Sequence, residues 1–274
     1  MATRIIVAVI AIPLLILLIF FAPIWAFGIV VGLISAGSAW ELLRCIDEKI
    51  PTRFRVYAAL TGFLTPVACS FSVTGSVITN TSMYALTLLM FCEIMLSYLG
   101  ENRIKVETAL AVIFAGAVMP LLLSALVRVG LHTSLTSVYL LLPFIAAFSS
   151  DSGAYFAGKF HGKRKVFPHL SPNKTLAGCI GGFVTSVIIM LLYGFILSRF
   201  DFKVNYVFLA VYGLLGSLAC QLGDLAFSAV KRQYGIKDYG HLIPGHGGML
   251  DRFDSMHFTA PMIELLVLFI PAIG

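Results

Sequence analysis

The stretch SAVKRQYGIKDYGHLIPGHGGMLDRFDS, residues 228–255, gathers basic residues, acids, histidines and glycines in a chain that is otherwise strongly apolar. Hydrophobic residues make up 59% of the 274 residues, and charged residues make up only 12%. An apolar run of helical length lies on each side of the stretch, at about residues 204–229 and 256–272. This pattern predicts two membrane helices joined by a polar connection.

Seven further apolar runs, bounded by charge, Pro or Gly, precede this pair of predicted helices. Each helix that spans a bilayer needs roughly 20 apolar residues, so the chain has room for about eight to ten spans with short connections. We therefore predict an all-α, polytopic integral membrane protein with about nine transmembrane helices. The predicted spans are 5–21, 24–43, 55–74, 83–99, 107–127, 136–150, 175–197, 204–229 and 256–272.

The basic residues indicate the orientation of these spans. If the N-terminus is cytoplasmic, only Arg128, Arg199 and Lys203 of the 19 Lys and Arg residues lie outside. This asymmetry agrees with the positive-inside rule. The net charge of +6 then follows one membrane face, which favours anionic lipid headgroups or a charged cytoplasmic substrate as partners and not nucleic acid. We expect the first apolar run to be a retained helix and the five cysteines to be packing residues.

Five acids lie in or beside the predicted spans, where a charge costs about 2.5–3.5 kcal/mol and usually has a partner or a function. Glu41 lies three residues before Arg44, which favours an interfacial ion pair. Glu93 and Glu264 favour hydrogen bonds between helices. The remaining two acids, Asp151 and Asp224, are candidates for a functional site.

Asp224 begins a polar stripe. If its helix continues through the following Lys-Arg pair, Ser228 and Lys231 follow Asp224 at i+4 and i+7 and lie on the same face. A carboxylate, a hydroxyl and an ammonium would then run from the membrane to its cytoplasmic edge. The alternative is that Ser228 and Lys231 only solvate a buried acid.

The loop after this helix has the residue types that bind phosphates. Glycines let the backbone approach a ligand and present N–H groups to anionic oxygens. If residues 250–256 begin the ninth helix, Asp251 and Asp254 share a face near its N-terminus, and such carboxylates suit Mg²⁺, which commonly uses one or two of them together with substrate phosphates. Arginine binds phosphate through two hydrogen bonds and lysine acts as a point charge. The basic residues concerned are Lys231, Arg232, Lys237 and Arg252.

The segment resembles the signature of CDP-diacylglycerol synthases (phosphatidate cytidylyltransferases), with the spacing intact. The matching residues are Ser228, Lys231, Arg232, Lys237, Asp238, His246, Gly247, Gly248, Asp251, Arg252 and Asp254.

Two earlier stretches are also similar to this family. One begins at Asp151 and runs to Lys159, and the other runs from Ser171 to Thr175, followed by Gly181-Gly182. Ser171-Pro172 also suits an N-cap and first position of the seventh span, whose positive end, with Lys174, would bind an anion. The alternatives are simple capping by Ser171-Pro172 and close helix packing at the glycines. Leu176 and Ala177 depart from the family pattern, which places a Glu or Gln after the Lys-Thr pair.

The resemblance implies that phosphatidate and CTP give CDP-diacylglycerol and pyrophosphate at the cytoplasmic face of the cell inner (plasma) membrane. It also implies Mg²⁺, with a second cation as an option, and makes a homodimer plausible. We expect one membrane-embedded domain, residues 1–274, with N-terminal helices in 1–150 and catalytic helices and loops in 151–274. The implied catalytic residues are Asp224, Asp251, Lys231, Arg232 and His246, with Asp224 and Asp251 as metal ligands. The implied substrate-binding residues are Asp151, Ser171, Lys174, Ser228, Lys237, Asp238, Gly247, Gly248, Arg252 and Asp254.

Several alternatives stay open at the level of sequence. His246 would either protonate the leaving pyrophosphate or only shape the glycine loop by a hydrogen bond. In one alternative the chemistry is the same, but the lipid substrate is an isoprenoid ether lipid phosphate in place of phosphatidate. A protein of another class, an ion-coupled transporter, would use Asp224, Glu93 and Glu264 as relay acids.

Overall fold

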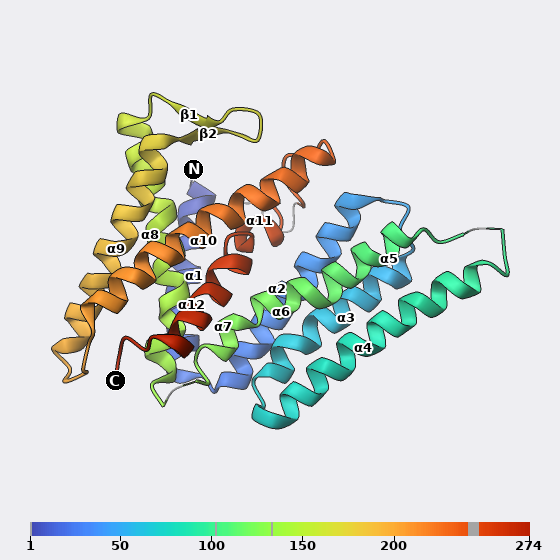
Figure 1. Cartoon of the computed structure of the whole chain (residues 1–274), viewed down its shortest axis with the longest axis horizontal. Coiled ribbons are helices and arrows are strands. Elements are labelled where there is room, and N and C mark those ends of the chain that lie inside the picture. The colour runs from blue at the N-terminus through green and yellow to red at the C-terminus, as the bar shows by residue number, and fades with distance from the viewer. Residues whose placement is uncertain (1, 102, 133, 241–246) are drawn as a thin grey trace. The chain divides into compact units, whose positions relative to one another are not determined.

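The computed structural model describes residues 2–101, 103–132, 134–240 and 247–274. Within these residues the chain is helical apart from one short antiparallel hairpin and an isolated bridge (Figure 1). In chain order the elements are α1 (Ala2–Phe21), α2 (Ile24–Ile46), α3 (Thr52–Cys69), α4 (Ser72–Ser97), α5 (Val106–Ile113), η1 (Phe114–Val118), α6 (Met119–Leu123), α7 (Ala125–Arg128), α8 (Thr136–His161), β1 (Lys165–Phe167), β2 (Ser171–Thr175), α9 (Leu176–Ser198), α10 (Tyr206–Gln233), α11 (Leu250–Phe253) and α12 (Met256–Phe269).

Six helices among the described residues are long and apolar enough to cross a membrane. They confirm the prediction of a largely helical, multi-pass membrane protein. The count of nine spans and the cytoplasmic N-terminus stay predictions. The six spans are Ile24–Ile46, Thr74–Ser97, Val106–Arg128, Thr136–His161, Leu176–Ser198 and Tyr206–Gln233.

The structure corrects three details of the sequence interpretation. The sixth span does not stop at residue 150, because α8 continues to His161. Ser171 and Pro172 do not begin the seventh helix, because they lie in β2. The ring of Pro172 disfavours the α-conformation for the residue before it, Ser171. The helix starts only after Thr175, whose Oγ1 accepts a hydrogen bond from the Gly178 N–H at 3.1 Å. The last helix is also interrupted, since α11 ends at Phe253 and α12 begins at Met256.

The chain forms two compact units. The first unit contains residues 1–128 and 234–253, and the second contains residues 129–233 and 254–274. Each predicted site residue therefore belongs to one of two frameworks, which are described separately below.

The first unit is built on close contact between α2 and α3. A Cβ added at Gly32 would lie 2.7 Å from the carbonyl oxygen of Phe63, so only glycine permits this approach. The fifth span is continuous through α5, η1, α6 and α7. Its π-helical turn directly precedes Met119-Pro120, where the proline lacks the N–H that a regular helix would use.

The second unit is built on α8, α9 and α10, with α12 packed beside α8 and α10. Glycines line the contact between α8 and α9: a Cβ at Gly178 would lie 2.9 Å from the Ala154 carbonyl oxygen, and one at Gly181 would overlap the Cβ of Ala157. The expectation that Gly178 and Gly181 serve close helix packing is confirmed. Hairpin β1–β2 lies at one end of α8 and α9 (Figure 1), with Lys165 paired to Thr175.

Two of the acids in predicted spans have partners elsewhere in the chain, as expected. Glu93 on α4 accepts a hydrogen bond from Arg53 on α3 at 2.7 Å. Glu264 on α12 lies 3.1 Å from the Nε2 of His132. These contacts stabilise acids that would be costly in an apolar setting without a partner.

Gly181→Val tests the packing of α8 against α9. Valine places carbon where Ala157 already stands, and overpacking of this kind costs about 1–3 kcal/mol. We expect a lower apparent Tm in detergent, followed by size-exclusion chromatography after heating. Gly100→Val is the matched control, because a Cβ there meets nothing within 4 Å. Equal losses of Tm in the two variants would contradict the packing assignment.

Candidate active site

A polar cavity of about 220 Å³ lies in the second unit, among α8, β2, α9 and α10. It brings together four residues of the predicted site, although they come from positions as far apart as 151 and 224. These residues are Asp151, Ser171, Lys174 and Asp224. The polar lining also includes the amides of Asn173 and Gln221.

An ion pair between Lys174 and Asp224 is the central contact of this cavity. Lys174 Nζ lies 2.5 Å from Asp224 Oδ2 and also donates to the carbonyl oxygen of Gln221 at 3.2 Å. The lysine side chain is 20% exposed and the aspartate 35%, so the pair is partly shielded from solvent. Hairpin β1–β2 delivers the lysine to α10, which places a cationic group beside the acid in a small polar cavity.

The polar stripe predicted on α10 is present, because α10 continues through Arg232 to Gln233. Ser228 Oγ donates to Asp224 Oδ1 at 3.5 Å. Lys231 is buried and lies 3.9 Å from Asp254 Oδ2. Asp224 thus pairs with Lys174 from the hairpin and accepts a hydrogen bond from Ser228, and Lys231 lies beside Asp254. The alternative in which Ser228 and Lys231 only solvate Asp224 stays a hypothesis.

Asp254 lies close to the stripe because α10 has a glycine there. A Cβ at Gly223 would be 3.0 Å from the Cα of Ser255 and 3.2 Å from the Asp254 carbonyl oxygen. Burial, followed by the charge of Asp224, raises the pKa of Asp254 to about 7 against the opposing effect of Lys231. Negative charge is therefore concentrated around Asp224, where a bound cation would relieve it.

The first unit carries the glycine loop and Asp251. Asp251 Oδ2 accepts hydrogen bonds from the N–H groups of Tyr239 at 2.8 Å and Gly248 at 3.0 Å. Gly247 has a φ of +84°, a conformation that side chains other than glycine rarely adopt. The loop backbone therefore fixes one carboxylate oxygen of Asp251.

Glu41 contacts the glycine loop, which the sequence interpretation did not predict. The structure does not bear out the expected pair of Glu41 with Arg44. The Nε of Arg44 lies 3.9 Å from Oε1 of Glu48 instead. The Glu41 carboxylate accepts hydrogen bonds from the N–H groups of Met249 at 2.9 Å and Leu250 at 2.8 Å. Met249 and Leu250 follow Glu41 by 208 and 209 positions in the sequence, so no local spacing indicates the contact.

The remaining predicted residues lie at the surface of their units. Arg232 is exposed and its Nε donates to the carbonyl oxygen of Leu170 at 3.3 Å. Lys237, Asp238 and Arg252 are exposed as well. His246 lies outside the described residues, so its two alternative roles stay predictions.

Gln221 is a second residue near the predicted site residues that the sequence did not indicate. Its Nε2 donates to the carbonyl oxygen of Cys179 at 3.1 Å and to Ser217 Oγ at 3.3 Å. It precedes Asp224 by one helical turn and lines the same cavity. Leu176 and Ala177, which depart from the family pattern, are not among the residues that line the cavity, whereas Gln221 and Asn173 are.

The donor set agrees with Mg²⁺ in chemistry. Asp224 already presents a carboxylate oxygen to a cation, the ammonium of Lys174. In the part of the chain that the structure describes, no cluster of three or more His, Cys, Asp or Glu residues could hold a metal ion by itself. Mg²⁺ commonly needs only one or two carboxylates when substrate phosphates supply further oxygens, so the acids present fit this ion.

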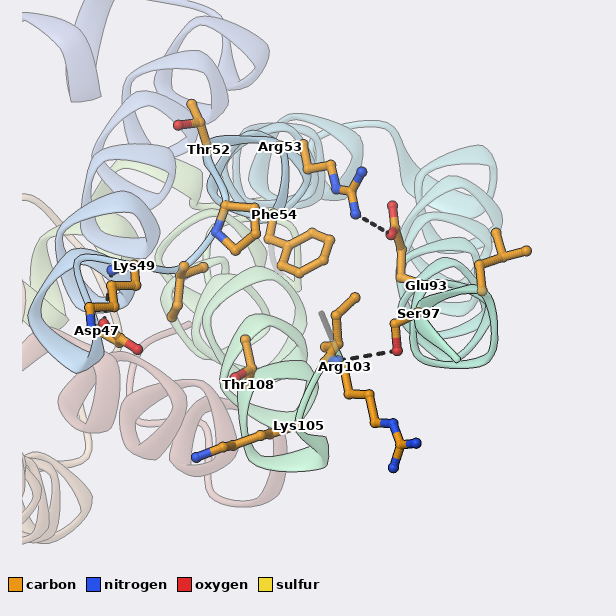
Figure 2. A pocket seen from close by; sticks show the side chains of 14 residues that line it. Asp47, Lys49, Thr52, Arg53, Phe54, Glu93, Ser97, Arg103, Lys105 and Thr108 are labelled. Atoms are coloured by element: carbon orange, nitrogen blue, oxygen red, sulfur yellow. Dashed lines mark hydrogen bonds and ion pairs between the residues drawn. The ribbon is translucent and has the colours of Figure 1, made fainter. Parts of the chain in front are cut away.

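A second cavity, of about 910 Å³, lies in the first unit and contains none of the predicted site residues (Figure 2). The Arg53–Glu93 ion pair crosses it, and Ser97 Oγ accepts a hydrogen bond from the Ile104 N–H at 3.1 Å. Of its basic residues, Lys49, Arg103 and Lys105 lie in short connections between helices and Arg53 lies in the first turn of α3. The positive-inside rule predicts basic residues in such segments on the cytoplasmic side. Cavity size alone would therefore have selected a different location from the one that the chemistry indicates.

Comparison with known proteins places the chain in a family. The model of the cytidylyltransferase family matches residues 2–270. A phosphatidate cytidylyltransferase of Staphylococcus haemolyticus is 42% identical over 139 residues, which cover 51% of this chain and 50% of the relative. Proteins of the same name from Staphylococcus aureus (strain COL) and Bacillus subtilis are 45% identical over 139 residues (51% and 50% of the two chains) and 43% identical over 129 residues (47% of each).

These alignments span about half the length of the curated relatives that the chain matches. The family model, in contrast, extends over nearly every residue from the first helix to the last. It includes the Asp224 cavity and the Asp251 loop alike. The chain therefore belongs to the cytidylyltransferase family.

Proposed function

We propose that the protein transfers a cytidylyl group from CTP to phosphatidate, giving CDP-diacylglycerol and pyrophosphate. The observation that carries the proposal is the signature with intact spacing, on a chain whose relatives are named phosphatidate cytidylyltransferases. The Lys174–Asp224 pair supports it, because a cation and a carboxylate share a small polar cavity. We further propose that the site faces the cytoplasm at the cell inner (plasma) membrane, where CTP and the lipid headgroup can both reach it.

The proposed reaction joins two anions. A phosphate oxygen of phosphatidate attacks the α-phosphorus of CTP, and the bond from that phosphorus to the leaving pyrophosphate breaks. A phosphate monoester is already mostly ionised near neutral pH, so a strong general base is not required. Catalysis then rests on charge neutralisation and alignment.

Each residue has a proposed role in this step. Basic side chains bind the phosphates of CTP and phosphatidate, and the glycine loop presents N–H groups to them. Mg²⁺, with a second cation as an option, would neutralise phosphate charge when bound by Asp224 and Asp251. The proposed basic residues are Lys174, Lys231, Arg232, Lys237 and Arg252, and the further substrate contacts are Asp151, Ser171, Ser228, Asp238, Gly247, Gly248 and Asp254.

Purified protein incubated with CTP, Mg²⁺ and phosphatidate tests the proposal directly. We expect labelled CTP to give CDP-diacylglycerol, and activity to vanish in excess chelator and return with added Mg²⁺. Product only with an isoprenoid ether lipid phosphate would replace the lipid in the proposal. Ion flux in proteoliposomes without any nucleotide turnover would replace it with a transporter.

Asp224→Asn and Asp251→Asn test the two proposed metal ligands. Each substitution removes a charge with little change of shape, and we expect each to abolish turnover while the protein still inserts and elutes as a folded species. Asp201→Asn is the matched control, because Asp201 is exposed and its φ of 63° suits asparagine equally well. Near-normal CTP-dependent activity in either site variant would remove that residue from the proposed role.

Lys174→Gln tests the cation of the cavity. Hydrogen bonds to charged groups contribute about 1.5–3 kcal/mol, which corresponds to a roughly 10–100-fold loss of kcat/KM. Lys163→Gln removes an exposed lysine close in sequence that does not line the cavity, and it should retain activity. Equal kcat/KM values for the two variants would show that Lys174 does not bind substrate.

A further inference from the structure

The loop of the signature is fastened to α2 by one buried carboxylate. The Glu41 side chain is on α2, and the residue is 8% exposed. Its Oε1 accepts the Met249 N–H and its Oε2 accepts the Leu250 N–H. A carboxylate removed from water costs several kcal/mol unless hydrogen bonds compensate it, and these two bonds use both of its oxygens.

The same carboxylate packs against Gly240 and Gly248. A Cβ built on Gly240 would lie 2.5 Å from Glu41 Oε1, and one built on Gly248 would overlap the carboxylate as well. Glycine at both positions allows the backbone to close around the acid. Glu41 is therefore in close contact with the backbone at two glycines, and Gly248 belongs to the signature.

Glu41 and Asp251 divide the N–H groups of this turn between them. Glu41 takes the N–H groups of Met249 and Leu250, and Asp251 takes those of Gly248 and Tyr239. Successive peptide groups thus point to two different carboxylates. Because both carboxylates accept N–H groups of neighbouring residues, a change at Glu41 would be transmitted through Gly248–Leu250 to Asp251.

We propose that Glu41 is a positioning residue that holds the Gly247–Leu250 turn so that Asp251 stands in the orientation needed to bind a divalent cation. The inference rests on the proposed function only for the reaction that this cation serves. Groups that orient a metal ligand typically change metal affinity or activity by 10–100-fold when they are removed. Glu41 acts here through backbone N–H groups and Asp251, without contact to substrate.

Glu41→Gln is the informative substitution. Glutamine keeps the shape but replaces one acceptor oxygen with an NH₂ group, which would face a backbone N–H that also donates. Glu41→Asp keeps the charge on a shorter side chain and should restore part of the function. Glu48→Gln is the matched control, because the Glu48 side chain is 80% exposed near the end of the same helix.

Two measurements that do not depend on turnover come first. Amide hydrogen exchange in peptides covering residues 237–253 should become at least tenfold faster in Glu41→Gln and stay unchanged in Glu48→Gln. The Kd for Mn²⁺, used in place of Mg²⁺ and followed by electron paramagnetic resonance, should rise about 10–100-fold in Glu41→Gln. In an Asp251→Asn background, Glu41→Gln should add no further loss of Mn²⁺ affinity.

The outcomes separate this inference from the proposed function. Unchanged exchange in Glu41→Gln would overturn the anchoring of the loop. Faster exchange with an unchanged Mn²⁺ affinity, or a wild-type protein that binds no Mn²⁺, would overturn the positioning role. If the exchange and affinity changes appear but wild-type protein makes no CDP-diacylglycerol, the proposed reaction fails and the role of Glu41 stands.

Discussion

The structure depends on one constraint: a carboxylate placed in or beside an apolar, membrane-spanning framework must have its charge compensated nearby. Asp224 meets this requirement through an ammonium, Glu41 through two backbone N–H groups, and Glu93 through a guanidinium. These three solutions differ in what they leave available. An ion pair in a polar cavity can be rearranged by a charged ligand, whereas a carboxylate committed to buried backbone groups can only support its surroundings.

The need to compensate the charge of Asp224 gives a role to two features that a simple helical bundle would not need, the β-hairpin and a glycine on α10. Hairpin β1–β2 interrupts the sequence of helices and carries Lys174 to α10, so the acid of one helix and the cation of a distant segment meet. Gly223 lets the chain at Asp254 approach the same helix. Burial, and after it the charge of Asp224, raises the pKa of Asp254. Such a site is suited to bind phosphates together with a cation.

Hydrophobic periodicity predicted most of the helices, because spans of about 20 apolar residues are set by local composition. The break at Pro23 agrees with the predicted spans 5–21 and 24–43. The continuation of α10 through Arg232 was only a condition at the level of sequence, and the structure shows it. The β-hairpin was not predicted, since Ser171-Pro172 is equally typical of a helix start. The Lys174–Asp224 pair and the Glu41 contacts join residues about 50 and more than 200 positions apart, and no spacing rule reports such contacts. Local chemistry therefore gave the candidate residues, and only the tertiary structure showed their neighbours.

The central claim is that the carboxylates of this chain hold a divalent cation together with the phosphates of a nucleotide. Pulsed electron paramagnetic resonance of the protein loaded with Mn²⁺ and a non-hydrolysable CTP analogue measures this directly, because phosphorus bound near Mn²⁺ gives a resolved ³¹P coupling. The account predicts a protein-dependent ³¹P coupling in wild-type protein that is lost when Asp224 is replaced by asparagine. The same coupling in wild-type protein and in the Asp224 variant, or none in either, would contradict it.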